Sequence, residues 1–486
     1  MSETAPWFSL PKPPRPALSS FSVLIIGAGL GGSWLARTLA ERGIASTVVE
    51  SNDIASGASG STVGVVKPYV TRAPCITEYF YNKAYGYLLQ RLSDWQLHER
   101  CGFNPCGVLQ LCHEPFPERL SEPLSAQLSD QQYERLSTQG AERQYERLSA
   151  QGAERQYERL SARGSERQYE RLSTQGSEPS SERDSKLGSK LGSRHGSQLG
   201  SEWGTNSSLT PAEASARAGV DISHHGLWFG DGGYLDPRSL CHALLEHPLI
   251  KLVTNNEVIH IDTSDESAHV TMMDKQELQA DVIILATGSS LRKFPATQHL
   301  AVVPARGQTS DFRCLSSSEM PRCVISSKRY VIPRKDSVTT GATFMRDDNK
   351  LGLSDEEHQQ NYQGLLDMLP GLECNSTPVN GYAGVRATTP DRLPLVGPVP
   401  DHAATADAYH DLHHGRPQQD YPKLPTIPRL MVLGGFGSRG IVTTAYSAHL
   451  LADYLLDMAP ATDSLTSFSS LLNPVRFQIR ALKRRQ

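Results

Sequence analysis

An apolar run that ends in closely spaced glycines constrains the fold of this chain more than any other feature. Residues 21–26 are apolar but for one serine, and Gly27, Gly29 and Gly32 follow before a helix expected over 33–42. In such a strand–turn–helix unit the first glycine permits a tight turn, the second lets backbone approach a pyrophosphate, and the third lets the helix pack on the strand. The N–H groups at the helix start then face the phosphates. The pattern predicts a dinucleotide site in an α/β fold.

Other segments carry features suited to the same ligand. A second expected strand, 46–50, ends in Glu50, whose carboxylate can accept hydrogen bonds from a ribose. The glycine pattern alone does not separate FAD from NAD. A buried strand over 281–285 runs into Ala286, Thr287 and Gly288, a turn typical of FAD proteins, so FAD is favoured.

A third glycine-rich turn lies near the end of the chain. It follows the apolar run 430–433 and precedes a helix expected over 441–456. Free N–H groups at that helix start give a second place to meet a ligand. Further strands are expected over 250–254, 257–262 and 269–273, the last two as a hairpin.

Bulk composition excludes several classes of protein. The chain has 486 residues, 38% of them hydrophobic, and a net charge of −4. This length suits about two or three domains, but the low apolar content indicates that part of the chain does not pack. No global basic field attracts nucleic acid, so an RNA partner must meet a local patch. The eight cysteines show neither a C-x-x-C pair nor zinc-ligand spacing, so no metal is predicted. Without a basic leader or a membrane-spanning run, we expect a soluble cytoplasmic protein.

Residues 131–178 repeat a short unit in which Tyr133, Tyr145, Tyr157 and Tyr169 stand in register. The constant spacing of these tyrosines fits neither a straight helix nor a coiled coil. Each copy of the unit also contains a glycine, which costs about 1 kcal/mol in a helix interior. A partner-binding array, an RNA-contacting arm and a disordered expansion are three interpretations. Low apolar content and high charge favour a disordered low-complexity insert over 118–206.

The order of the expected elements implies interleaved domains. We expect a discontinuous FAD-binding domain over 21–75, 225–293 and 384–465, and a substrate domain over 76–117, 207–224 and 294–383. A Pro-rich linker over 1–20 precedes them, and a basic tail over 466–486 follows. Five cations gather in the tail, where they would hold phosphates without base specificity, or form only a frayed, solvated terminus.

A series of motifs, in order, resembles the amine-oxidising flavoproteins of the glycine oxidase, sarcosine oxidase and D-amino acid oxidase type. Within that family the chain looks like the FAD-dependent C-terminal half of the bifunctional proteins that make 5-methylaminomethyl-2-thiouridine in tRNA. The resemblance runs from residue 21 to about residue 483, apart from the insert. The matching segments are 57–60 with Gly64 and Pro68, 106–111, 232–237, 306–308, 341–347, 385–397, 437–440 and 472–476.

The resemblance implies a glutathione reductase-type Rossmann-like FAD-binding domain and a second α+β substrate domain built on an antiparallel sheet. The family oxidises a secondary amine that carries a carboxymethyl group, and the resulting imine hydrolyses to glyoxylate and a primary amine. In the tRNA version, 5-carboxymethylaminomethyl-(2-thio)uridine at the wobble position of the anticodon stem-loop becomes 5-aminomethyl-(2-thio)uridine. The methyltransferase half of the bifunctional proteins has no counterpart here, so a separate methyltransferase is an expected partner.

The same resemblance implies the site residues. Arg386 is expected to clamp the substrate carboxylate and Tyr330, on a strand over 330–334, to share that clamp. Lys67 stands where the family has an aromatic residue and would assist oxygen reactivity or meet a phosphate. The expected cofactor-binding residues are Gly27, Gly29, Gly32, Glu50, Gly57, Ser59, Gly60, Ser61, Gly64, Val258, Ala286, Thr287, Gly288, Gly435, Gly437, Ser438, Arg439, Gly440 and Ile441.

Each of these roles has a plainer alternative. Arg386 could form a surface ion pair with Asp391, Tyr330 could be a half-buried strand aromatic, and Lys67 a solvated lysine. Arg439 would add positive charge near the flavin, contact RNA, or form a salt bridge at a helix start. For the whole protein, a small-molecule oxidase acting on glycine or sarcosine, and an inactive flavoprotein scaffold, stay open beside the tRNA enzyme.

Overall fold

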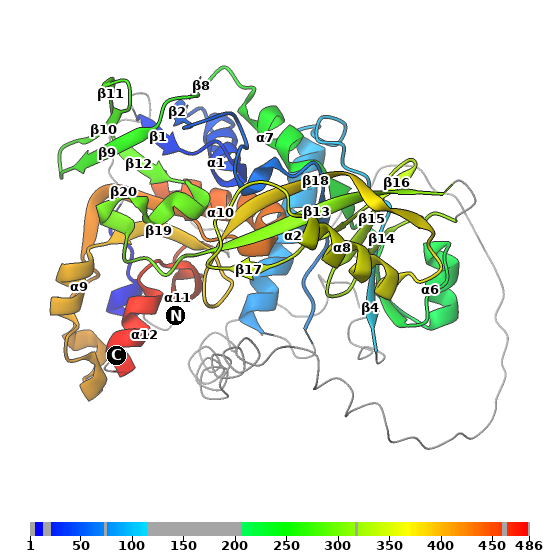
Figure 1. Cartoon of the computed structure of the whole chain (residues 1–486). Coiled ribbons are helices and arrows are strands. Elements are labelled where there is room, and N and C mark those ends of the chain that lie inside the picture. Colours follow the sequence, from blue (N-terminus) through cyan, green and yellow to red (C-terminus); the bar gives the residue numbers. More distant parts are fainter. Residues whose placement is uncertain are drawn as a thin grey trace. The chain divides into compact units, whose positions relative to one another are not determined.

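A six-stranded sheet, mostly parallel, forms the first layer of the fold, with strand order β19–β20–β12–β1–β2–β8 (Figure 1). The computed structural model describes residues 5–12, 21–71, 75–113, 206–315, 319–458 and 464–484. Every pairing in this sheet is parallel except that of β19 with β20. The strands are β1 (Val23–Ile26), β2 (Ser46–Val49), β8 (Ile250–Val253), β12 (Val282–Leu285), β19 (Leu395–Pro400) and β20 (Thr426–Gly434).

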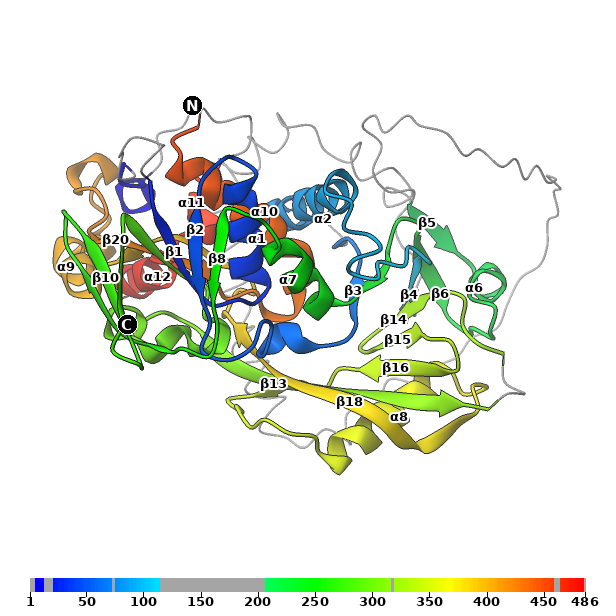
Figure 2. The same cartoon turned by 90° about the horizontal axis from the view of Figure 1, so that it is seen from above.

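Both β1 and β12 are buried along their whole length, as their continuous apolar runs predict for a parallel sheet covered on both faces. Helix α1 (Leu30–Ala40) packs against α7 (Pro237–Leu245) and α10 (Gly440–Leu455), and α10 packs against α2 (Ile76–Asp94). Figure 2 shows these four helices together beside the sheet. Helix α1 begins three residues earlier than predicted, because Gly31 and Gly32 belong to its first turn.

A nine-stranded sheet forms the second layer. Its pairings are antiparallel except that of β4 with β14. The long strands β13 and β18 pair along most of their length, and α8 (Asp355–Met368) packs on both. The strands are β4 (Val108–Cys112), β5 (Asn206–Leu209), β6 (His225–Phe229), β13 (Val303–Cys314), β14 (Val324–Ser326), β15 (Tyr330–Pro333), β16 (Ser337–Gly341), β17 (Met345–Arg346) and β18 (Cys374–Thr388).

Smaller elements complete the described residues. Strands β9 (Val258–Thr263), β10 (Ala268–Met272) and β11 (Glu277–Ala280) form a meander, and β3 (Gly64–Val66) pairs with β7 (Gly233–Leu235). The remaining helices are α6 (Pro211–Ala218), α9 (His402–Ala408), α11 (Ser469–Leu472) and α12 (Arg476–Arg484).

The structure bears on several segment predictions without testing the domain boundaries themselves. Strand β6 lies in the nine-stranded sheet, although 225–293 was assigned to the FAD-binding domain, and β18 crosses the predicted boundary at 384. The repeats, and the predicted insert up to residue 205, lie outside the described residues. Within the predicted N-terminal linker, Trp7 is buried in a cluster with Tyr409, Tyr421, Val475 and Ile479.

Two features are absent from the described residues. None of their helices is long and apolar enough to cross a membrane. Nor do they bring three or more His, Cys, Asp or Glu side chains together as a metal site would require.

Candidate active site

The turn between β1 and α1 has the close backbone approaches that its glycines predict. Gly27 has a φ of +110°, and a Cβ there would lie 2.5 Å from the carbonyl oxygen of Ala286. A Cβ on Gly32 would lie 1.9 Å from the Gly27 oxygen, so only glycine lets the helix start this close to the strand. The Ala28 N–H donates to Glu50 Oε2 over 2.8 Å, which brings that carboxylate to the turn.

The loop 57–64 borders this turn. Ser59 Oγ accepts a 3.0 Å hydrogen bond from the Leu30 N–H at the start of α1. At Gly60 a Cβ would lie 2.3 Å from the hydroxyl oxygen of Tyr382, and at Gly64 it would lie 2.1 Å from Ile441 Cδ1. The loop therefore links α1, the nine-stranded sheet and α10. Gly57 and Ser61 belong to the same loop; the Gly57 carbonyl accepts from the Tyr382 hydroxyl and the Ser61 hydroxyl donates to the Val63 carbonyl.

The turns after β12 and β20 carry further predicted cofactor-binding residues. The buried hydroxyl of Thr287 has no hydrogen-bond partner in the described part of the chain. Gly435 and Gly437 have φ values of +72° and +54°, and Gly440 opens α10. Of the other predicted residues, Ala286 and Gly288 flank Thr287, Ser438 is exposed, and the Val258 side chain is buried in the core beneath β9.

These features fit an FAD molecule. The glycines leave backbone uncovered along a path from β1 to α10, and the start of α1 offers N–H groups to a pyrophosphate. The unpartnered Thr287 hydroxyl is a buried polar group that a ligand would satisfy.

One face of the nine-stranded sheet turns toward these loops. Strand register aligns a row of residues across six strands, and residues opposite one another in register share a face. Arg386 lies four residues after Tyr382 on β18, so it shares this face too. The row is Gln110, Ser326, Tyr330, Gly341, Thr309 and Tyr382.

Arg386 is half-buried with few partners. Its Nη1 donates to the Thr343 carbonyl over 3.4 Å, and its Cζ lies 5.9 Å from the centre of the Phe344 ring. The guanidinium crosses Gly307, where a Cβ would lie 2.0 Å from Nη1. Burial lowers its pKa, while the neighbouring Tyr330 opposes that shift. No described carboxylate forms an ion pair with Arg386, so its donors suit an incoming carboxylate.

Arg306, on the neighbouring strand β13, differs from Arg386 because it is buried and forms an ion pair. It pairs with Val385 in register while Ala305 pairs with Arg386, so the two arginines lie on opposite faces. Arg306 is 4% exposed and its Nη2 lies 2.5 Å from Glu357 Oε2 of α8. It also donates to the Lys350 and Gly352 carbonyls over 2.6 and 2.7 Å. These contacts make Arg306 part of the support under the site.

Lys67 and Arg439 lie at the other end of the row. Lys67 Nζ donates to Gln110 Oε1 over 2.6 Å, so the solvated-lysine alternative is wrong. Burial, with a contribution from the charge of Arg439, lowers the pKa of Lys67 to about 7. The Arg439 guanidinium lies 4.1 Å from the centre of the Tyr69 ring and 4.9 Å from that of Tyr81. Within the described part of the chain, Arg439 thus forms cation–π contacts and no salt bridge.

The proposed pairing of Arg386 with Asp391 is wrong. Asp391 instead receives two hydrogen bonds from Arg476, at 2.9 and 3.0 Å, and one from Arg480 at 3.1 Å. Arg476 is 1% exposed, so neither the phosphate-binding tail nor the frayed, solvated terminus describes this residue. Enclosing one of these charges without the other would be costly, and the structure accordingly pairs the two.

Sequence reasoning missed Gln110 and Tyr382 as site residues, although both lie in the row. Neither position carries a signal of its own in the sequence. Gly307 is a usable signal of a different contact. A glycine within a strand often marks the close approach of another group, and here that group is the Arg386 guanidinium.

A family model described as FAD dependent oxidoreductase matches residues 22–454. A tRNA 5-methylaminomethyl-2-thiouridine biosynthesis bifunctional protein MnmC from Pseudomonas putida (strain GB-1) is 29% identical over 99% of this chain and 62% of its own length. The protein of that name from Chromobacterium violaceum is 28% identical over 99% of this chain and 63% of its own length. The chain thus spans less than two thirds of these relatives.

Solved structures share the fold. Glycine oxidase from Geobacillus kaustophilus superposes with a TM-score of 0.59 at 17% identity, over 92% of this chain and 98% of that one. Iminodiacetate oxidase from Chelativorans sp. BNC1 gives a TM-score of 0.57 at 20% identity, over 91% and 97% of the two chains. At these identities the likeness concerns the fold alone, and it agrees with the predicted α/β fold, a Rossmann-like FAD-binding domain with a second domain built on an antiparallel sheet.

Proposed function

Because the chain belongs to the family of FAD dependent oxidoreductases, we propose that it oxidises the carboxymethylamine of a modified wobble uridine in tRNA. The substrate would be 5-carboxymethylaminomethyl-(2-thio)uridine, and the products 5-aminomethyl-(2-thio)uridine and glyoxylate. The similarity to the tRNA-modifying relatives supports this choice of substrate. The observation that carries the proposal is Arg386, a half-buried guanidinium without an ion-pair partner among the described residues, on the face that borders the glycine loops.

The residues would share the work as follows. The start of α1 and Ser59 would hold the pyrophosphate, and Glu50 would hold the adenosine ribose. The start of α10 would contact the flavin pyrimidine carbonyl, where negative charge develops on reduction. FAD supplies the acceptor for the hydride that leaves the carbon beside the amine nitrogen. Arg386 would bind the substrate carboxylate in a bidentate geometry, and the Tyr330 hydroxyl, whose pKa is raised by burial, would donate a hydrogen bond to the same group.

Lys67 would control a proton beside the reacting amine. Its pKa of about 7 allows a neutral amine to accept a proton near neutral pH, and the bond to Gln110 holds it in place. A secondary amine must lose its proton before the neighbouring carbon gives up a hydride, so a base in this position would favour the reactive form.

A direct assay tests the proposal. Purified flavoprotein is incubated with tRNA that carries 5-carboxymethylaminomethyl-uridine, and in parallel with free glycine and sarcosine. We expect glyoxylate and 5-aminomethyl-uridine from the tRNA and little turnover of the free amino acids. Turnover of the amino acids with unchanged tRNA would refute the tRNA substrate and favour a small-molecule oxidase. No turnover of any substrate by flavin-loaded protein would favour the inactive scaffold.

The proposal places the protein in the cytoplasm, where its substrate would be found. It also retains the prediction that a methyltransferase acts next on the product amine.

A further inference from the structure

Two cysteines meet where β13 ends and β18 begins. Cys314 and Cys374 are 60 residues apart in the chain, yet their sulfurs are 2.6 Å apart. Both are free thiols in the structure. They lie on the same two strands as Arg306 and Arg386, but at the opposite end of the strand pair.

The backbone around the two cysteines suits a cross-strand bond. The Leu315 N–H donates to the Glu373 carbonyl over 2.9 Å, whereas the Cys314 N–H turns the other way, to the Asp336 carbonyl. Cys314 and Cys374 are therefore a non-hydrogen-bonded pair, in which opposed Cα atoms lie about 4.5 Å apart. Disulfides span Cα separations of about 4.4–6.8 Å, so the strands need not move to form one.

The two thiols differ in reactivity. The hydrogen bond from Cys374 lowers the pKa of Cys314, and the same bond raises the pKa of Cys374. Because the thiolate is the attacking species in disulfide exchange, Cys314 is the nucleophile and Cys374 the thiol that resolves the intermediate.

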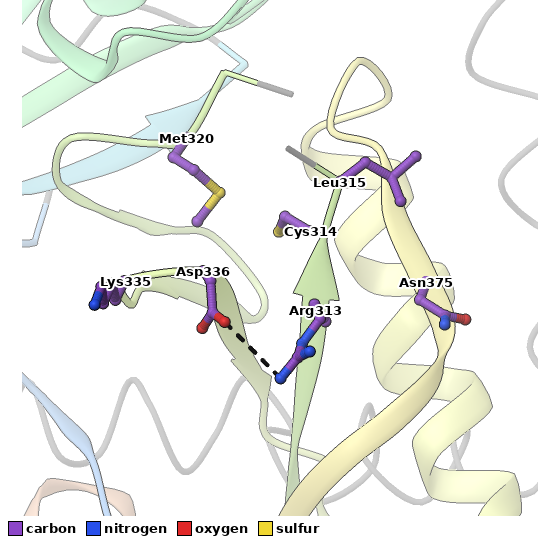
Figure 3. Close-up of a pocket in the computed structure, with 7 residues that line it drawn as sticks. All are labelled: Arg313, Cys314, Leu315, Met320, Lys335, Asp336 and Asn375. Carbon is purple, nitrogen blue, oxygen red and sulfur yellow. Dashed lines mark ion pairs between the residues drawn. The ribbon is translucent and has the colours of Figure 1, made fainter. Parts of the chain in front are cut away.

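A pocket gives an oxidant access to Cys314. Figure 3 shows Cys314 among the residues that line it, with Met320 opposite and Arg313 and Lys335 at its sides. The pocket has a volume of about 510 Å³. Arg313 forms an ion pair with Asp336 over 3.8 Å, and Lys335 adds a second cation that suits an anionic reactant.

We propose that Cys314 and Cys374 are a redox pair that a small anionic disulfide, such as oxidised glutathione, converts to an intramolecular disulfide. The Cys314 thiolate attacks one glutathione sulfur, forms a mixed disulfide and releases the first glutathione thiolate. Cys374 then gives up its proton and attacks the Cys314 sulfur, which releases the second glutathione thiolate. The two cysteines lose two electrons, the oxidant gains them, and the two thiol protons pass to the released thiolates. The bond cross-links the strand pair β13–β18 at the end opposite to Arg386.

Thiol trapping on the full flavoprotein tests this pair. The protein is equilibrated with increasing ratios of oxidised to reduced glutathione, its remaining thiols are blocked with N-ethylmaleimide, and an unreduced digest is analysed by mass spectrometry. We expect a peptide pair joined through Cys314 and Cys374, lighter than the two free peptides by two hydrogen atoms and separated by dithiothreitol. Cys106→Ser, which leaves the pair intact, should behave like the wild type.

A second variant distinguishes the roles of the two thiols. Cys374→Ser should accumulate a glutathione adduct on Cys314, because no resolving thiol remains. The proposal is overturned if both cysteines of the wild type carry N-ethylmaleimide at every ratio, or if Cys314 of the wild type stays glutathionylated without reaching Cys374. The wild-type measurement decides the matter even if the variant does not fold.

Discussion

Replacing Arg386 should remove substrate binding and leave folding almost intact. Its 3.4 Å bond to the Thr343 carbonyl is long, and none of the described carboxylates forms an ion pair with it. The variant Arg386→Gln therefore loses only weak interactions in the free protein, and we expect its free energy of unfolding to fall by less than about 1 kcal/mol. A bidentate pair with a substrate carboxylate contains two charge-assisted hydrogen bonds of about 1.5–3 kcal/mol each.

The lower value for each bond gives the expected loss of activity. Two bonds of about 1.5 kcal/mol amount to about 3 kcal/mol, or a decrease in kcat/KM of roughly 100-fold. Glyoxylate release from tRNA measures kcat/KM, and urea unfolding measures stability. Arg386→Lys, which keeps the charge but loses the planar fork, should recover only part of the activity.

Arg306→Gln is the matched control on the opposite face. It leaves Glu357 buried without its ion-pair partner, which should cost about 3–5 kcal/mol of stability. The reasoning is refuted if folded Arg386→Gln keeps kcat/KM within about threefold of the wild type. It is equally refuted if Arg386→Gln unfolds as readily as Arg306→Gln.

Three further predictions concern the cofactor loops, Lys67 and the C-terminal helix. Gly27→Ala should lower flavin content at matched FAD concentration by about tenfold or more, because a Cβ 2.5 Å from the Ala286 oxygen, at a φ of +110°, adds about 1–3 kcal/mol of strain; unchanged flavin absorbance per polypeptide would contradict this. The pKa of Lys67 falls from its ordinary 10.5 to about 7 on folding, so the unfolded chain binds more protons between these values. Urea unfolding should then show wild type gaining stability relative to Lys67→Met as pH rises from 7 to 10, by at most about 1.4 kcal/mol per pH unit, and a flat difference would refute the buried lysine. Arg476→Leu should cost about 3 kcal/mol at neutral pH, because it removes an arginine partner of Asp391, whose side chain is only 10% exposed. Burial alone would raise the pKa of Asp391, but the charges of Arg476 and Arg480, with hydrogen bonds from Arg476 and the Leu393 N–H, together lower it, so this cost should shrink as acid protonates Asp391. Exposed Arg484→Leu is the control, and equal urea midpoints for the two variants would contradict the buried pair.

The loops around the cofactor could be predicted from sequence because their chemistry is local. A buried strand, a glycine turn and a helix start lie within a few residues of one another at Gly27, and the same sequence pattern recurs at Gly288 and Gly437. Strand β12 and helix α10 matched the predicted bounds to within one or two residues, whereas α1 begins earlier than predicted.

What escaped prediction depends on pairings between distant segments. Asp391 lies closer in sequence to Arg386 than to Arg476. It nevertheless pairs with Arg476, because α12 returns to the turn after β18. Likewise Lys67, which follows β3, contacts Gln110 of β4, although the two residues are 43 positions apart in the chain and β3 pairs with β7. Sequence distance gives no measure of such contacts, which depend on which strands become neighbours.

The alternation of β13 explains why the segment 306–308 reads Arg-Gly-Gln. Arg306 and Gln308 point to the face covered by α8, where both bond to main chain near the start of that helix. Gly307 points to the other face, and its missing side chain leaves the space that the Arg386 guanidinium crosses. A single alanine at Gly307 would keep the support intact and still displace the guanidinium, because its Cβ would lie 2.0 Å from Nη1. Strand β13 thus carries paired polar side chains on one face and leaves room on the other for Arg386, the proposed ligand of the substrate carboxylate. The alternation of side chains along the strand separates the two.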